Sequence, residues 1–135
     1  MMTRRRVVFG CLAIGAMVVN GPAFAAAKRS RVMQLLDPDN DGTVDLDEAK
    51  RAASAVFDRL ERDRDGTLER RELRGRMSAR ELQAADPDRD GTLTKDEYLK
   101  EVEKRFRAAN PDNDGTLDGK ELQTPAGRAL LRLLQ

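Results

Sequence analysis

A twelve-residue pattern of acidic side chains occurs four times in this 135-residue chain and constrains its fold more than any other feature. In the first copy Asp37, Asp39 and Asp41 stand at alternate positions, Gly42 follows, and Glu48 closes the segment. Oxygens at positions 1, 3 and 5 converge when the chain wraps round an ion, and glycine at position 6 permits the sharp turn. The glutamate at position 12 is long enough to reach back and bind through both oxygens. The pattern therefore predicts a site for a hard cation such as calcium.

The four copies are residues 37–48 (loop 1), 61–72 (loop 2), 86–97 (loop 3) and 110–121 (loop 4). Each has Asp at positions 3 and 5, followed by Gly, Thr and an aliphatic residue, and each ends in Glu. Asp-Gly turns without a metal are the alternative, but they explain four copies in register poorly. The expected ligands are the side chains at positions 1, 3, 5 and 12 and the carbonyl at position 7: Asp37, Asp39, Asp41, Thr43, Glu48, Glu61, Asp63, Asp65, Thr67, Glu72, Asp86, Asp88, Asp90, Thr92, Glu97, Asn110, Asp112, Asp114, Thr116 and Glu121.

Over about residues 32–122 the repeats resemble EF-hand calcium loops, and their short period resembles that of small exported bacterial EF-hand proteins. The resemblance implies an all-α fold in which four EF-hand-like loops are joined by short helices, with minimal β-bridges between loops. It also implies Ca²⁺ as the bound ion. Glutamate at every twelfth position favours calcium over magnesium, because a bidentate ligand suits the higher coordination number.

The loops differ in charge, so we expect them to differ in affinity. Loop 1 has six carboxylates and no basic residue, whereas loop 2 has five carboxylates and four arginines. Loop 3 has five carboxylates against two basic residues, and loop 4 has four against one. Loop 2 also begins with Glu61, where the family usually has Asp. The predicted order of affinity is loop 1, then loops 3 and 4, with loop 2 weakest or vacant.

Apolar residues recur at helical spacing after loops 1 and 3, which predicts helices over 46–60 and 98–109. The segment 73–85 is less regular because it contains Gly75, and two short helices meeting near Ser78 are expected there. If one helix joins each pair of successive loops, neighbouring loops lie at opposite ends of it. We therefore expect loop 1 to pair with loop 3, and loop 2 with loop 4.

Two further helices are expected at the ends of this region. Ser30 is a candidate cap for a short helix entering loop 1, and Thr124-Pro125 is a helix-start signal after loop 4. Leucines crowd residues 130–134. We expect this tail to join the core, a membrane or partner surface being the alternative.

Residues 1–25 have the features of a signal peptide, with three arginines before a short apolar stretch and an Ala-Phe-Ala cleavage site at 23–25. Cleavage as late as residue 27 fits equally well, and an uncleaved anchoring helix is the alternative. The arginines suit either general or twin-arginine export. The expected mature chain, residues 26–135, is a single EF-hand domain that is exported to a periplasm or secreted. It has 22 basic and 24 acidic residues and no cysteine.

The leading functional expectation is a non-enzymatic calcium buffer or calcium-stabilised structural module. The alternative is a sensor that binds a partner protein or envelope surface in a calcium-dependent way. The chain has no histidine, and its single cysteine lies in the signal segment, so catalytic and zinc sites of the usual kinds are not expected. Neither nucleic-acid binding nor stable membrane insertion of the mature chain is expected. With only 4% aromatic residues, the metal-free chain is expected to be partly disordered.

Overall fold

The computed structural model describes residues 31–135, so the expected signal peptide and the candidate cap Ser30 lie outside the described residues. Five helices of 6 to 15 residues and four very short strands make up the fold of the described residues, which confirms the all-α class. In chain order the elements are α1 (Arg31–Leu36), β1 (Val44–Asp45), α2 (Leu46–Leu60), β2 (Thr67–Glu69), α3 (Ala79–Ala85), β3 (Thr92–Thr94), α4 (Lys95–Ala109), β4 (Thr116–Leu117), the 3-10 turn η1 (Glu121–Gln123) and α5 (Pro125–Leu134). Within residues 31–135 no helix is long and apolar enough to cross a membrane.

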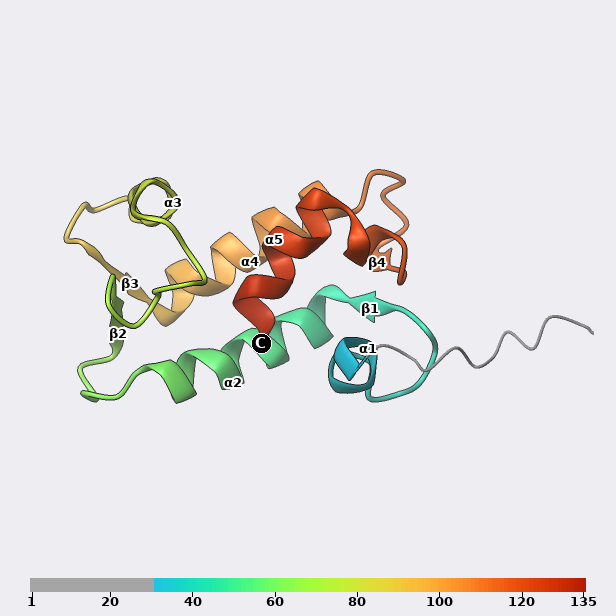
Figure 1. Cartoon of the computed structure of the whole chain (residues 1–135), viewed down its shortest axis with the longest axis horizontal. Helices are drawn as coiled ribbons and strands as arrows, with labels where there is room; N and C mark the ends of the chain where they lie inside the picture. The colour runs from blue at the N-terminus through green and yellow to red at the C-terminus, as the bar shows by residue number, and fades with distance from the viewer. Residues whose placement is uncertain (1–30) are drawn as a thin grey trace, which may run out of the picture.

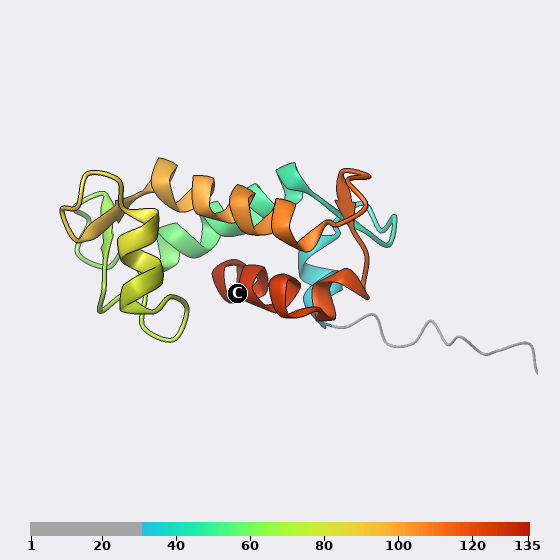
Figure 2. The same cartoon turned by 90° about the horizontal axis from the view of Figure 1, so that it is seen from above.

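Two long helices, α2 and α4, form the body of the molecule and hold the loops at its two ends (Figures 1 and 2). Each begins with a capping box that the loop before it supplies. In α2, the Asp45 side chain accepts the N–H of Glu48, while Glu48 accepts the N–H of Asp45. Thr94 and Glu97 repeat this exchange at α4. The last residues of loops 1 and 3 therefore start the two helices.

The strands join the loops in a different pairing from the one expected. Val44 of loop 1 pairs antiparallel with Leu117 of loop 4, and Leu68 of loop 2 pairs with Leu93 of loop 3. The expected pairing of loop 1 with loop 3 and of loop 2 with loop 4 is wrong. The prediction assumed that one long helix joins every two successive loops. Only loops 1 and 2, joined by α2, and loops 3 and 4, joined by α4, are connected in this way. Between loops 2 and 3 the chain folds back, so these loops meet at one end and loops 1 and 4 meet at the other (Figure 1).

The reversal between loops 2 and 3 lies in residues 70–77, which form turns where the first of two short helices was expected. Gly75 stands in the left-handed region with a φ of 82°, a conformation that glycine adopts without strain and in which an α-helix cannot continue. Ser78 then caps α3, as its capping-box pattern predicts, with its hydroxyl accepting the N–H of Glu81 at 3.2 Å. One helix is therefore present in this segment rather than two.

The core lies between α2, α4 and α5, and the aliphatic residues of the four strands extend it to both ends. Val44, Leu68, Leu93 and Leu117, at position 8 of the loops, are all fully buried. In the centre, the rings of Phe57 and Tyr98 meet edge to face with centroids 5.7 Å apart.

The final helix α5 packs against both long helices, and its apolar residues belong to the core as expected. Thr124 caps it and Pro125 follows in the first turn. Leu130, Leu133 and Leu134 are buried, and the Tyr98 hydroxyl donates a hydrogen bond of 2.7 Å to the Leu133 carbonyl. Burial raises the pKa of Tyr98 to about 12, so this hydroxyl remains a donor throughout the ordinary pH range.

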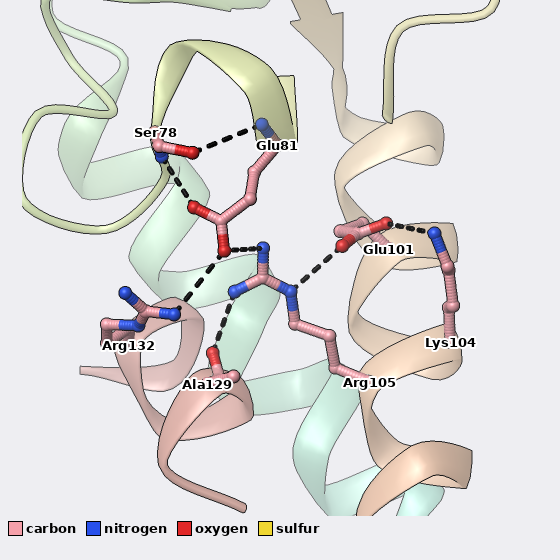
Figure 3. A network of polar contacts seen from close by, with 7 residues as sticks. All are labelled: Ser78, Glu81, Glu101, Lys104, Arg105, Ala129 and Arg132. Atoms are coloured by element: carbon pink, nitrogen blue, oxygen red, sulfur yellow. Dashed lines mark hydrogen bonds and ion pairs between the residues drawn. The ribbon is translucent and has the colours of Figure 1, made fainter. Parts of the chain in front are cut away.

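A polar network fastens α3, α4 and α5 together (Figure 3). At its centre is the buried guanidinium of Arg105 in α4, which donates to Glu101 at 2.9 Å and to the Ala129 carbonyl of α5 at 2.8 Å. It also meets Glu81 of α3 at 3.3 Å, and Arg132 of α5 approaches the same oxygen at 3.4 Å. Because α3 leads into loop 3, this network fixes the position of that loop relative to the helices.

We expect Glu81→Gln to destabilise the fold by about 1–2 kcal/mol at pH 7, because glutamine keeps the cap but loses the charge that faces the arginines. The hydrogen bond from the Ser78 N–H, with the nearby arginine charges, lowers the pKa of Glu81 against the opposing effect of burial. A lowered pKa adds stability above the ordinary glutamate value, and this stability is lost as the pH falls through the folded value. Urea unfolding of both proteins should therefore show the difference shrinking below about pH 4. A constant difference from pH 7 to pH 3 would contradict this account.

Candidate metal centres

The four loops share one backbone geometry. Position 4 has a positive φ in every loop, and the residues there are Asn40, Arg64, Arg89 and Asn113, with φ between 55° and 62°. The glycine at position 6 has φ between 83° and 91° in each loop. Asparagine adopts the left-handed conformation more readily than arginine does, so loops 2 and 3 hold this turn at some cost that loops 1 and 4 avoid.

Hydrogen bonds orient the acidic side chains toward the inside of each loop. The position-5 aspartate accepts both the N–H and the hydroxyl of the position-7 threonine, as Asp41 does from Thr43 at 2.8 Å each. Loops 2, 3 and 4 repeat this arrangement. The position-1 carboxylate accepts the glycine N–H, at 2.9 Å from Gly42 to Asp37 in loop 1. Hydrogen bonds within the chain are therefore enough to bring the oxygens of the turn close together.

In loops 1 and 3 the expected ligands at positions 1, 3 and 12 form tight clusters. Each residue offers an oxygen that lies within 4.8 Å of the other two, and the clusters are Asp37, Asp39 and Glu48 in loop 1, and Asp86, Asp88 and Glu97 in loop 3. The first and last members of the loop 1 cluster are buried. Three carboxylates at this separation repel one another, and a bound cation relieves that repulsion. An all-oxygen set of this kind suits a hard cation.

Loop 2 assembles a different set. The residues with converging oxygens are Glu61, Asp63 and Asp65, without the glutamate at position 12. Both oxygens of Glu72 instead accept backbone hydrogen bonds, from Arg62 at 3.1 Å and from Glu69 at 3.0 Å. In loops 1, 3 and 4 the hydrogen bonds given to the corresponding glutamate all go to Oε2. In loop 2 the twelfth residue is therefore absent from the cluster of converging oxygens to which the sequence pattern assigns it.

Loop 4 has an asparagine at position 1, and the surroundings of its side-chain oxygen support an ion site. Asn110 is 6% exposed, and its side-chain oxygen is buried without a hydrogen-bond partner. A buried amide oxygen without a partner costs free energy comparable to a lost hydrogen bond. This atom is the one expected to bind the ion in loop 4, so an ion there would satisfy it.

The pKa values of two carboxyl groups in the loops are raised by burial and by nearby negative charge. Burial raises the pKa of Glu48, and the negative charges of Asp45, Asp39 and Asp37 raise it further, against a hydrogen bond from the Asp45 N–H. Burial also raises the pKa of Asp63, with the charges of Asp65 and Glu72 adding to it. Such groups hold their protons more readily than isolated carboxylates do, so a metal ion must displace protons as the pH falls.

Position 9 has a role that the ligand pattern did not predict. Asp45, Thr94 and Asp118 each accept the N–H of the glutamate at position 12, and that glutamate accepts the position-9 N–H in return. The same glutamate thus starts the following turn and faces the ion site. The capping-box spacing of Asp or Thr three residues before Glu was the signal in the sequence that could have revealed this.

This helix–loop–helix geometry with converging carboxylates defines the class of protein. The EF hand family matches residues 79–102, which comprise α3, loop 3 and the first half of α4. Over these residues the chain is similar to the EF-hand family, and the converging carboxylates of loop 3 agree with that similarity.

A curated relative supports the same class. Over 65 residues the chain is 53% identical to lanmodulin from Methylorubrum extorquens (strain AM1). This similarity covers 47% of the present chain and 49% of that protein, so it spans about half the length of the relative.

Proposed function

We propose that this protein binds calcium ions through its four loops and acts as a calcium buffer or a calcium-stabilised structural module. The observation that carries the proposal is the clustering of the Asp37, Asp39 and Glu48 oxygens, which loop 3 repeats. The orphaned oxygen of Asn110 supports an ion in loop 4. The expected ligands are those given above, at positions 1, 3, 5, 7 and 12 of each loop. Calcium would neutralise the negative charge of these carboxylates, and the chain would surround the ion with oxygen ligands.

A trivalent lanthanide ion is the second candidate ligand. The name of the relative lanmodulin points to lanthanides, and lanthanide ions are hard cations that also prefer oxygen ligands. Loop 1 carries six carboxylates and no basic residue, which favours an ion of higher charge because the Coulomb energy grows with that charge. Competition between calcium and terbium at the same loops decides between the two ions.

The buffer or structural role is favoured over the sensor role by the distribution of apolar side chains. A sensor needs a groove that a target can enter, and methionines commonly line such grooves. Met33 and Met77 are both buried in the core. Among the described residues, Leu35 is the one large apolar side chain that is well exposed, and α5 occupies the surface between the long helices.

The proposed setting is outside the cytoplasm. The arginine-rich start, short apolar stretch and Ala-Phe-Ala site of residues 1–25 support export to a periplasm or beyond. The proposed mature chain has a small excess of acidic residues, and most of them stand in the loops. An extracytoplasmic calcium protein needs only moderate affinity, because sites in such places are commonly half-saturated at about 10⁻⁴–10⁻³ M.

Calorimetric titration of the purified protein with calcium, repeated with terbium, tests the proposal. We expect three or four binding events, with the weakest at loop 2. The variant Asp37→Asn, which gives loop 1 the residue that loop 4 has at position 1, should weaken the tightest event, and Asp47→Asn, outside the expected ligand set of the same loop, serves as the matched control. Absence of binding at millimolar concentrations of either ion would overturn the proposal.

A further inference from the structure

A pocket of about 490 Å³ opens beside loop 2, at the end of the molecule that also carries loop 3. The C-terminal end of α2 and the turns after loop 2 supply its walls. Four basic and two acidic side chains line it: Arg62, Arg71, Arg74, Arg76, Asp63 and Glu72. The two acidic residues are expected ligands of the loop 2 ion, so the pocket and the ion site adjoin.

The arginines of this pocket are incompletely paired. Arg71 is engaged with Glu69 at 2.8 Å. Among residues 31–135, no ion pair joins Arg62, Arg74 or Arg76 to an acidic side chain. Arg76 donates through Nη2 to the Gln135 carbonyl, while its Nε is buried without a hydrogen-bond partner. A buried guanidinium N–H without an acceptor is costly, and the Arg76 side chain that carries it lines the pocket.

Loop 2 also assembles its oxygens without the glutamate at position 12. The converging oxygens belong to Glu61, Asp63 and Asp65, whereas the two oxygens of Glu72 accept the N–H groups of Arg62 and Glu69. An ion held by Glu61, Asp63, Asp65 and the Thr67 carbonyl would therefore lack the bidentate glutamate. Calcium takes six to eight oxygens, so positions on the ion would remain for ligands from outside the chain.

We propose that this pocket binds a small soluble oxyanion, a carboxylate or phosphate, which bridges the loop 2 ion and the arginines. This inference rests on the proposed function, because it requires an ion in loop 2. The anion supplies the oxygens that loop 2 lacks, and Arg62, Arg74 and Arg76 neutralise its charge. Guanidinium groups suit carboxylate and phosphate because their N–H groups match two oxygens at once.

The bridging arrangement makes metal binding and anion binding mutually dependent. Without an anion, the four arginines of loop 2 repel the cation and its affinity is low. A bound anion offsets the charge of the arginines and attracts the cation, and the cation in turn attracts the anion. Linkage requires the two effects to be equal, so the anion raises the affinity for the ion by the same factor as the ion raises the affinity for the anion.

Nuclear magnetic resonance on the full chain, with inorganic phosphate as the probe, tests this inference. The amide of Gly66 donates to Glu61 in loop 2, whereas Gly42 and Gly91 donate to Asp37 and Asp86 in loops 1 and 3. Their signals therefore report the three loops separately. We expect millimolar phosphate to lower the calcium dissociation constant read at Gly66 by about fivefold or more, and to leave the other two unchanged.

The variant Arg74→Gln should abolish the effect of phosphate at Gly66 while calcium still shifts all three signals. Arg51→Gln, at an exposed position of α2, is the matched control and should behave like the parent protein. Circular dichroism establishes that both variants keep their helices. An equal effect of phosphate in Arg74→Gln and the parent would overturn the assignment of the pocket.

The remaining outcomes separate this inference from the function on which it rests. If calcium shifts none of the three glycine signals, the proposed function fails. If calcium shifts them but phosphate changes nothing at Gly66, the inference alone fails. Binding of phosphate that is equally strong without calcium overturns the bridge. Binding to phosphatidylglycerol vesicles without any effect of free phosphate overturns the soluble anion in favour of a lipid headgroup.

Discussion

Glu48→Gln should lower the affinity of loop 1 for calcium by on the order of 100-fold, the largest effect we expect from any single substitution. Glutamine can still accept the hydrogen bond that the Asp45 N–H now gives to Glu48 at 2.8 Å, so the cap of α2 survives. The substitution removes the negative charge from a cluster whose other members, Asp37 and Asp39, remain. It thereby isolates the contribution of the bidentate carboxylate to the ion.

The same substitution should also affect loop 4, because the strand pairing links the two loops. Thr116, whose carbonyl is an expected ligand in loop 4, stands opposite Asp45 of loop 1 in the two-stranded sheet. An ion in loop 1 therefore orders the backbone that presents the loop 4 ligand. We expect Glu48→Gln to weaken loop 4 by a few-fold and to leave loop 3 at the other end of the molecule unchanged.

Glu72→Gln is the matched variant for this comparison. Because both oxygens of Glu72 are held by backbone N–H groups, its replacement should change calcium binding far less than the replacement of Glu48 does. Calorimetric titration of both variants provides the measurement. Loss of a tight site in Glu72→Gln but not in Glu48→Gln would refute the predicted order of affinities. Equal weakening of loops 3 and 4 in Glu48→Gln would contradict the coupling through the sheet.

The local elements of this fold could be predicted from the sequence because short-range patterns determine them. Capping boxes and apolar periodicity placed α2, α4 and the start of α3, and Thr124-Pro125 placed α5. Short-range sequence patterns could not predict which loops pair with each other. It depends on whether residues 70–77 continue as a helix or reverse direction, and the positive φ of Gly75 decides this in favour of reversal.

The backbone geometry of the loops was also predictable from local sequence, and the ligand assignments stay predictions. Positions 1 and 3 converge in loops 1, 2 and 3 because the turn that carries them is local, and the loop geometry follows from the position of the glycine. The position of Glu72 was not predictable from spacing, because it depends on hydrogen bonds from two N–H groups. The pocket beside loop 2 likewise arises only when the reversal after this loop brings Arg74 and Arg76 toward Arg62.

Removal of bound calcium by a chelator should lower the melting temperature by about 15 °C or more. Each ion kept at a thousand times its dissociation constant stabilises the fold by about 4 kcal/mol, and for a domain of roughly a hundred residues 1 kcal/mol corresponds to about 4–8 °C. The carboxylates of Asp37, Asp39 and Glu48 repel one another when the ion is gone. That repulsion acts directly on the loops that begin the two long helices, so helix should be lost as well.

Circular dichroism during heating, with and without chelator, measures both quantities. The metal-free protein should retain some helix, because Phe57, Tyr98 and the leucines of α5 contribute core residues that lie outside the loops. High salt serves as the control, since it screens the repulsion between carboxylates without filling the sites and should restore only part of the lost stability. An unchanged melting temperature after chelation would mean that the core alone stabilises this fold and that the loops bind ions without supporting it. Full recovery in salt without calcium would mean that relief of charge repulsion, rather than coordination, is what the ions contribute.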